Sequence, residues 1–297
     1  MSRAVYLLFV LHCSTILACA GGNSGTCSRD EECASGFCRA DGTCGPTDVD
    51  AAVSDDAIDG SSELCAPNHD GQIEVAELPL IAGRMATFRF ATNPAFDTTG
   101  QANADGSRRW DLTAQLAGDT DQVVALASPT GAWWQPSFPN ATYAVTLAQG
   151  SDLLGVFAVD ATAVTLLGVV SPEAGALRTE LAYDPPAKIL SLPFGATSTW
   201  SSTSTISGTA QGIITAYTER YQSLVDLVGT MTTPYGEFPV LRVATDLTRT
   251  AGLATLLTKR TFAWTAECFG SVATVSSQDF ETSSEFADPA EVRRIAP

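Results

Sequence analysis

From residue 85 onward, short runs of β-branched and aromatic residues are separated by Gly, Pro, Asn and Asp. Many runs alternate apolar and polar positions, which is the period of a strand with one buried face. In LRVATDL, residues 241–247, Leu241 and Val243 would face one side of a sheet and Arg242 the other. The pattern predicts a mainly β domain over residues 85–297, built as an antiparallel curved sheet, a sandwich or a half-barrel.

Three local elements can be placed within this pattern. Helical periodicity is limited to Ile73–Leu78 and Pro289–Ile295, and we expect a short helix at each. The run GTMTTPYGEFPVLRV, residues 229–243, has the turn letters Thr-Pro-Tyr-Gly between two strand-like halves. It predicts a hairpin in which Gly236 takes a positive φ.

That hairpin and the upstream segment LAYDPPAKILSLPFGATSTW, residues 181–200, also carry a loose family resemblance. Together they resemble parts of exported bacterial proteins with a wrapped antiparallel sheet of lipoprotein-carrier type. The resemblance implies a curved sheet with an apolar concavity that holds an acyl chain. A well-filled sandwich explains the same residues.

The N-terminus, MSRAVYLLFVLHCSTILACAGG, has the three parts of an export signal. Arg3 gives a positive start, an apolar run follows, and small residues end it, so residues 1–18 are predicted to be a signal peptide. The letters Ile-Leu-Ala-Cys ending at Cys19 resemble the lipobox of bacterial lipoproteins, which implies lipidation of Cys19 and a tether over residues 19–26. Ala20 favours the outer membrane by resemblance to the enterobacterial sorting rule. The alternative is an ordinary cleaved signal with an unrelated cysteine.

Six further cysteines form an even set, which is typical of an oxidising compartment. Residues 27–45 hold four at short spacing and predict a small disulfide knot, because such a segment cannot bury a core of its own. Zinc is the rival interpretation, disfavoured by wide gaps and by oxidation of exported thiolates. The knot resembles the Dickkopf-N-terminal-like motifs of myxobacterial lipoproteins. Its cysteines are Cys27, Cys33, Cys38 and Cys44.

Two cysteines, Cys65 and Cys268, bracket the β domain, and we expect them to pair. Residues 46–64 lie just before this bracket and are rich in Asp, Ser and Ala. Such a composition predicts a disordered acidic linker, because it offers too little apolar surface to bury.

Residues 65–84 contain CAPNHDGQIEVAEL, which looks like a calcium loop followed by a short helix. With Gly71 at position six of an EF-hand-like loop, five candidate ligands fall at the right spacing, but Ala66 stands where the first Asp belongs. The alternative is a turn that caps a short helix ended by Pro79. The candidate ligands are Asn68, Asp70, Gln72, Glu74 and Glu77.

Charge and histidine content restrict the chemistry further. The formal net charge of -17 argues against a nucleic-acid partner, since phosphate contacts need Lys and Arg. His69 is the one histidine after the signal, and no nucleophile-elbow motif accompanies it. Paired carboxylates from distant strands remain an option, as in glycoside hydrolysis, although Glu180, Glu219 and Glu267 are each expected to face solvent.

The segment GAWWQPSFPNATY, residues 131–143, concentrates four aromatic residues. If exposed, they would stack on sugars or line a groove. Burial in the core is favoured, with at least one of two adjacent tryptophans pointing out of it. The four are Trp133, Trp134, Phe138 and Tyr143.

These features predict an exported, non-enzymatic protein of the cell envelope, held in the outer membrane by a lipid anchor. Its expected partner is an apolar ligand or another envelope protein, and no cofactor is expected beyond the calcium option. The alternatives are a lipid-anchored hydrolase that uses carboxylates, and an inert structural lipoprotein.

Overall fold

The computed structural model describes residues 65–297, and these fall within one compact unit. The predicted signal peptide, the lipidation site Cys19, the four-cysteine knot and the acidic linker lie outside the described residues. They remain predictions. The described part is mainly β, as the hydrophobic pattern predicts, and its first long strand starts at Met85.

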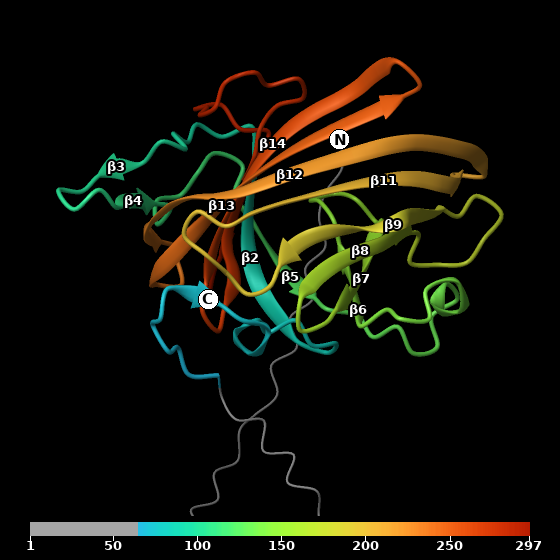
Figure 1. Cartoon of the computed structure of the whole chain (residues 1–297), viewed down its shortest axis with the longest axis horizontal. Coiled ribbons are helices and arrows are strands. Elements are labelled where there is room, and N and C mark those ends of the chain that lie inside the picture. The colour runs from blue at the N-terminus through green and yellow to red at the C-terminus, as the bar shows by residue number, and fades with distance from the viewer. Residues whose placement is uncertain (1–64) are drawn as a thin grey trace, which may run out of the picture. The chain divides into compact units, whose positions relative to one another are not determined.

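Twelve strands follow one another in a single curved, mostly antiparallel sheet that is nearly closed (Figure 1). The predicted curved antiparallel sheet is therefore confirmed. In spatial order the strands are β5 (Thr120–Ala125), β2 (Met85–Thr92), β16 (Glu291–Ile295), β15 (Gly270–Ser276), β14 (Ala254–Ala266), β13 (Glu237–Ala251), β12 (Ile213–Thr232), β11 (Thr199–Ala210), β9 (Glu180–Ser191), β8 (Ala163–Val170), β7 (Leu154–Val159) and β6 (Tyr143–Thr146).

The two edge strands of this sheet, β5 and β6, approach each other. Ala127, just after β5, forms an antiparallel bridge with Ala144 of β6. The Gln149 side chain donates a hydrogen bond to the Thr120 hydroxyl at 2.6 Å, and its backbone N–H donates to Glu291 at 3.2 Å. These contacts occupy part of an edge that would otherwise offer unpaired backbone groups to another chain.

Strand β12 changes partner along its length, and this creates the one parallel pairing among the named strands of residues 65–297. Its first part pairs with β11, whereas Gly229–Thr232 run parallel to β4 (Arg108–Asp111), which also pairs with β3 (Gln101–Ala102). A side chain at position 229 would collide with the Arg108 carbonyl, so the close approach of β4 requires glycine there. The expected sheet is thus antiparallel except at this point.

Two of the expected local elements differ in the structure. The segment 73–78 forms strand β1 (Gln72–Ile73), paired with β10 (Phe194–Gly195), and then the 3₁₀-helix Val75–Glu77. The helix expected at Pro289–Ile295 is wrong: Glu291–Ile295 is strand β16, hydrogen-bonded to both β2 and β15. Tertiary pairing overrides the local periodicity of such short segments.

The predicted hairpin between β12 and β13 is confirmed, but its glycine is not in the left-handed region. Thr233 and Gly236 exchange backbone hydrogen bonds of 2.8 and 3.2 Å, which places Pro234 and Tyr235 at the two central positions. Gly236 is then the last residue of the turn, a position that needs no positive φ.

The predicted disulfide between Cys65 and Cys268 is confirmed, with 5.5 Å between the two Cα atoms. The aromatic segment 131–143 is not a strand until residue 143; it forms turns and the 3₁₀-helix Gln135–Ser137. Trp134, Phe138 and Tyr143 are buried as favoured. Trp133 is half-buried and donates its indole N–H to the Ser171 carbonyl at 3.0 Å.

Candidate functional site: an apolar pocket beside the disulfide

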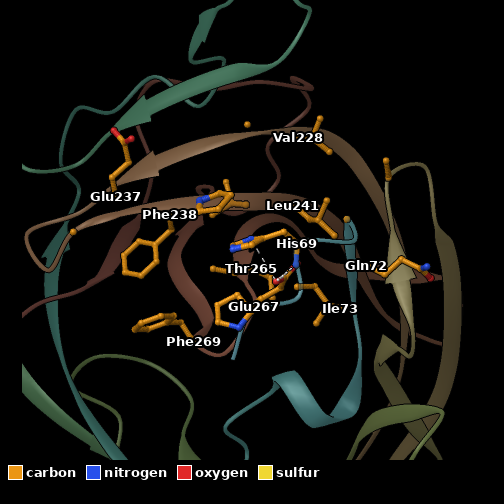
Figure 2. A pocket seen from close by; sticks show the side chains of 18 of the residues that line it. His69, Gln72, Ile73, Val228, Glu237, Phe238, Leu241, Thr265, Glu267 and Phe269 are labelled. Atoms are coloured by element: carbon orange, nitrogen blue, oxygen red, sulfur yellow. Dashed lines mark hydrogen bonds and ion pairs between the residues drawn. The ribbon is translucent and has the colours of Figure 1, made fainter. Parts of the chain in front are cut away.

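A pocket of about 650 Å³ opens where the entry segment of the domain meets the ends of three strands (Figure 2). Its walls come from residues 67–73, the loop after β10, the hairpin between β12 and β13, and the end of β14. This volume lies within the usual range for sites that bind small molecules. The side chains that carry the argument below are His69, Ile73, Val228, Tyr235, Glu237, Phe238, Leu241, Thr265, Glu267 and Phe269.

One side of the pocket is an aromatic wall formed by Tyr235, Phe238 and Phe269. The ring centroids of Phe238 and Phe269 lie 4.8 Å apart, and Tyr235 lies 6.2 and 6.0 Å from them. Phe238 is buried, whereas Phe269 is 37% and Tyr235 is 53% exposed. Each ring therefore packs on its neighbours while two of them still present apolar surface to solvent.

The opposite side is aliphatic and joins two parts of the core. Ile73 and Leu241 belong to one buried cluster, whereas Phe238 belongs to another, so the pocket lies where these two clusters meet. Val228 extends the aliphatic surface and is 41% exposed.

The entry segment is held in place by covalent and polar contacts to the turn after β14. Besides the Cys65–Cys268 disulfide, the His69 N–H donates a hydrogen bond to the Glu267 carboxylate at 2.9 Å. The Cys268 N–H donates to the Glu77 carbonyl at 2.8 Å. This explains how a segment nearly two hundred residues away in sequence becomes a wall of the pocket.

The candidate calcium ligands lie in this same entry segment, and three of the five side chains accept hydrogen bonds from nearby backbone N–H groups. Asn68 accepts the Asp70 N–H at 2.9 Å, and Asp70 accepts the Gln72 N–H at 2.8 Å. Glu77 is buried and accepts the Glu74 N–H at 2.9 Å. Within residues 65–297, no three His, Cys, Asp or Glu side chains form a group that would hold a metal. Calcium binding here stays a prediction.

The expectation that three glutamates face solvent is wrong for Glu219. Its side chain is 1% exposed and is bonded to the hydroxyls of Tyr183 and Tyr221, at 3.0 and 2.6 Å, and to Arg249 at 2.7 Å. Burial raises the pKa of both tyrosines, and the Glu219 charge raises it further. Strand alternation itself places Glu219 on the same face of β12 as Ser223 and Val225, which are buried, so the error lay in expecting a glutamate to take the solvent side.

The other two glutamates lie apart from Glu219. Glu180 accepts the Ser137 hydroxyl at 2.6 Å and has Arg178 at 3.3 Å. Glu267 has only 13% of its side chain exposed, and it alone of the three lines the apolar pocket. The structure therefore does not bring the three candidates for carboxylate catalysis together.

A second pocket of about 620 Å³ lies between β11, β12, β13 and β14, and we call it the polar pocket because Asp226, Asp246, Arg260 and Glu285 line it beside apolar side chains. Behind it, Arg242 is 1% exposed and lies 2.6 Å from both Asp226 and Glu285. Burial of this guanidinium opposes its charge, but the two carboxylates outweigh burial and raise the pKa of Arg242. Arg260 lies 2.7 Å from Asp246, and this hydrogen bond raises the pKa of Arg260.

The lipoprotein-carrier resemblance implies an apolar concavity, but the sequence does not indicate where this pocket lies or which residues line it, and it does not indicate the burial of Arg242. The available signals were local: a tyrosine in the hairpin turn Pro234–Gly236, and a phenylalanine directly after Cys268. Neither signal indicates that Tyr235 and Phe269 lie side by side, because this contact depends on the strand order of the folded sheet.

No protein-family model, curated protein or solved structure matches this chain. Across residues 65–297, no helix has the length and apolar character needed to cross a bilayer.

Proposed function

We propose that this protein is an exported lipoprotein whose β domain binds a small apolar ligand without catalysis. The observation that carries the proposal is the apolar pocket, in which Val228, Tyr235 and Phe269 expose large side chains that a ligand would cover. Apolar surface removed from water stabilises a complex by about 2.5 kcal/mol per 100 Å². A ligand that covers these side chains would therefore gain more free energy from burial than it loses in entropy on binding, and we expect measurable affinity.

The location rests on the N-terminal sequence. The signal-like residues 1–18 and the lipobox ending at Cys19 support an outer-membrane lipid anchor in the cell envelope. Mass spectrometry of the protein from its native membrane tests this part. An unmodified Cys19 would overturn the anchor while leaving the ligand proposal open to its own test.

The ligand proposal is tested with N-phenyl-1-naphthylamine, a neutral probe whose fluorescence rises in apolar surroundings. The full chain carrying Cys19→Ser is titrated, so that attached lipid does not take up the probe. Phe269→Ala should weaken binding about tenfold, because a partly buried phenyl contributes on the order of 1.5 kcal/mol. The matched control is Leu253→Ala, which removes a fully exposed apolar side chain outside the pocket.

Two results would overturn the proposal. One is the absence of saturable probe binding to the parent chain. The other is an equal loss of binding in Phe269→Ala and Leu253→Ala, which would indicate general surface adsorption rather than a site.

A further inference from the structure

The charged groups of the apolar pocket are all of one sign. Its lining includes the carboxylates of Glu237 and Glu267 and no Lys or Arg. An isolated charge near apolar walls interacts more strongly with a ligand than the same charge in open water does. The head group of a ligand would therefore be selected by charge, not only by size.

Glu267 is the carboxylate best placed for this role. Its Oε2 atom accepts the His69 N–H, whereas no described residue donates a hydrogen bond to Oε1. Its one ion-pair neighbour among residues 65–297 is the exposed His69 ring, at 3.8 Å. Glu237 differs, because it is 57% exposed and already has Arg109 at 3.6 Å.

A hydroxyl lies close by on the same stretch of chain. Thr265 is 1% exposed, lines the pocket two residues before Glu267, and its Oγ1 has no hydrogen-bond partner among the described residues. Figure 2 shows Thr265, Glu267 and His69 together in the middle of the pocket, with the rings of Phe238 and Phe269 to one side. The Glu267 carboxylate and the His69 ring are thus gathered at one point of an apolar surface, and the buried Thr265 hydroxyl lies near them.

The aromatic wall does not itself form a cage for a cation. Cages that bind quaternary ammonium groups hold the cation between ring faces. Here the three rings touch one another, with centroids 4.8 to 6.2 Å apart, and leave no gap between them. The rings supply apolar contact, and the carboxylate supplies the charge.

We propose that this pocket selects amphiphiles with a primary ammonium head and an apolar body, and disfavours fatty-acid anions. The inference rests on the proposed function, since it names the ligand class of the same pocket. An ammonium donates hydrogen bonds that Glu267 Oε1 accepts, whereas a fatty-acid carboxylate would meet the like charge of Glu267. This differs from the acyl-chain ligand that the lipoprotein-carrier resemblance implies.

The test is a competition series with one chain length and three heads. Octylamine, octanol and octanoate displace N-phenyl-1-naphthylamine from the full chain with Cys19→Ser at about pH 8, where an ordinary imidazole is uncharged. Octylamine should displace the probe at roughly tenfold lower concentration than octanoate does, with octanol between them. Because this comparison needs no pocket variant, it does not depend on the folding of a mutant.

Two isosteric variants separate a specific carboxylate from the general acidity of the protein. Glu267→Gln and Glu237→Gln change the net charge equally, so attraction of amines to the whole surface is the same in both. Glu267→Gln should bring the octylamine and octanoate midpoints within about threefold of each other, whereas Glu237→Gln should keep most of the difference.

The outcomes distinguish this inference from the function on which it rests. If the neutral probe does not bind, both fail. If the probe binds but octanoate competes as well as octylamine, or if Glu267→Gln keeps the full preference, the apolar pocket stands and the head-group assignment is wrong.

Discussion

Two pockets of the β domain are nearly equal in volume, about 650 and 620 Å³, yet their charged groups are arranged in opposite ways. In the polar pocket, Asp226 and Glu285 are bonded to the buried Arg242, and Asp246 is bonded to Arg260. In the apolar pocket, Glu267 has no Lys or Arg partner among the described residues.

The difference shows that the role of a carboxylate in a cavity, structural or ligand-binding, can be judged only together with its ion-pair partners. A carboxylate that neutralises a buried arginine is part of what holds the strands together, since the arginine would otherwise be an unpaired buried charge. A carboxylate without such a partner keeps its charge for an incoming group. By this criterion the polar pocket is architecture, and the apolar pocket is the proposed binding site.

The largest expected effect comes from the polar pocket. Arg242→Met keeps apolar packing near Phe262 and Trp110 but removes the one cation that Asp226 and Glu285 share. We expect a loss of about 3–5 kcal/mol in the free energy of unfolding, because a buried pair is broken on one side. Urea denaturation followed by tryptophan fluorescence measures it.

Arg260→Met is the matched control for that change. Asp246, its partner, is 50% exposed, so we expect at most about 1 kcal/mol. Equal losses in the two variants would contradict the view that burial of Arg242 makes its pairs structural.

The next effect in size should come from the disulfide, whose loss should affect the walls of the apolar pocket but not those of the polar one. Removing the disulfide with Cys65→Ser and Cys268→Ser should lower stability by about 2–4 kcal/mol. It should also weaken probe binding, because residues 67–73 form a wall of the apolar pocket and take no part in the polar one. Denaturation and probe titration of the double variant check both parts; unchanged probe affinity would show that the entry segment holds its place without the covalent bond.

The smallest effects should have opposite signs in the two regions. Thr265→Val at the apolar pocket removes a buried hydroxyl that has no described partner, so stability should rise by about 1 kcal/mol. Thr245→Val near the polar pocket removes a partner of Ser223, bonded at 2.9 Å, so stability should fall by about 1 kcal/mol. The melting temperatures of the two variants, compared with that of the parent chain, test this prediction. Shifts of the same sign in both variants would contradict it.

Much of the fold could be predicted from the sequence because strand alternation is a local signal. The strand beginning at Met85 and the hairpin at Thr233–Gly236 follow from letters that lie next to one another. Strand β16 could not, since its pairing with β2 joins residues some two hundred positions apart. Strand alternation places Arg242 on the face opposite Leu241 and Val243. The sequence does not show that β4 and its neighbours, which are distant along the chain, cover that face.

The site was less accessible to sequence reasoning than the fold. Single positions such as Glu267 were singled out as candidates, and the Cys65–Cys268 pairing was predicted. Their common location was not, because the pocket is assembled from four separated stretches of chain. The exposure of Phe269 results from that assembly and cannot be predicted from the neighbouring residues in the sequence.

The disulfide at the domain entrance also decides how the domain would carry a mechanical load. A pull on the chain ahead of residue 65 reaches the Cys65–Cys268 bond before it reaches the two-residue pairing of β1 with β10. The tension then passes into the end of β14, a central strand held on both sides by β13 and β15. The weak pairing of β1 with β10 therefore does not carry this force. The wall of the apolar pocket should keep its structure while the domain is under tension.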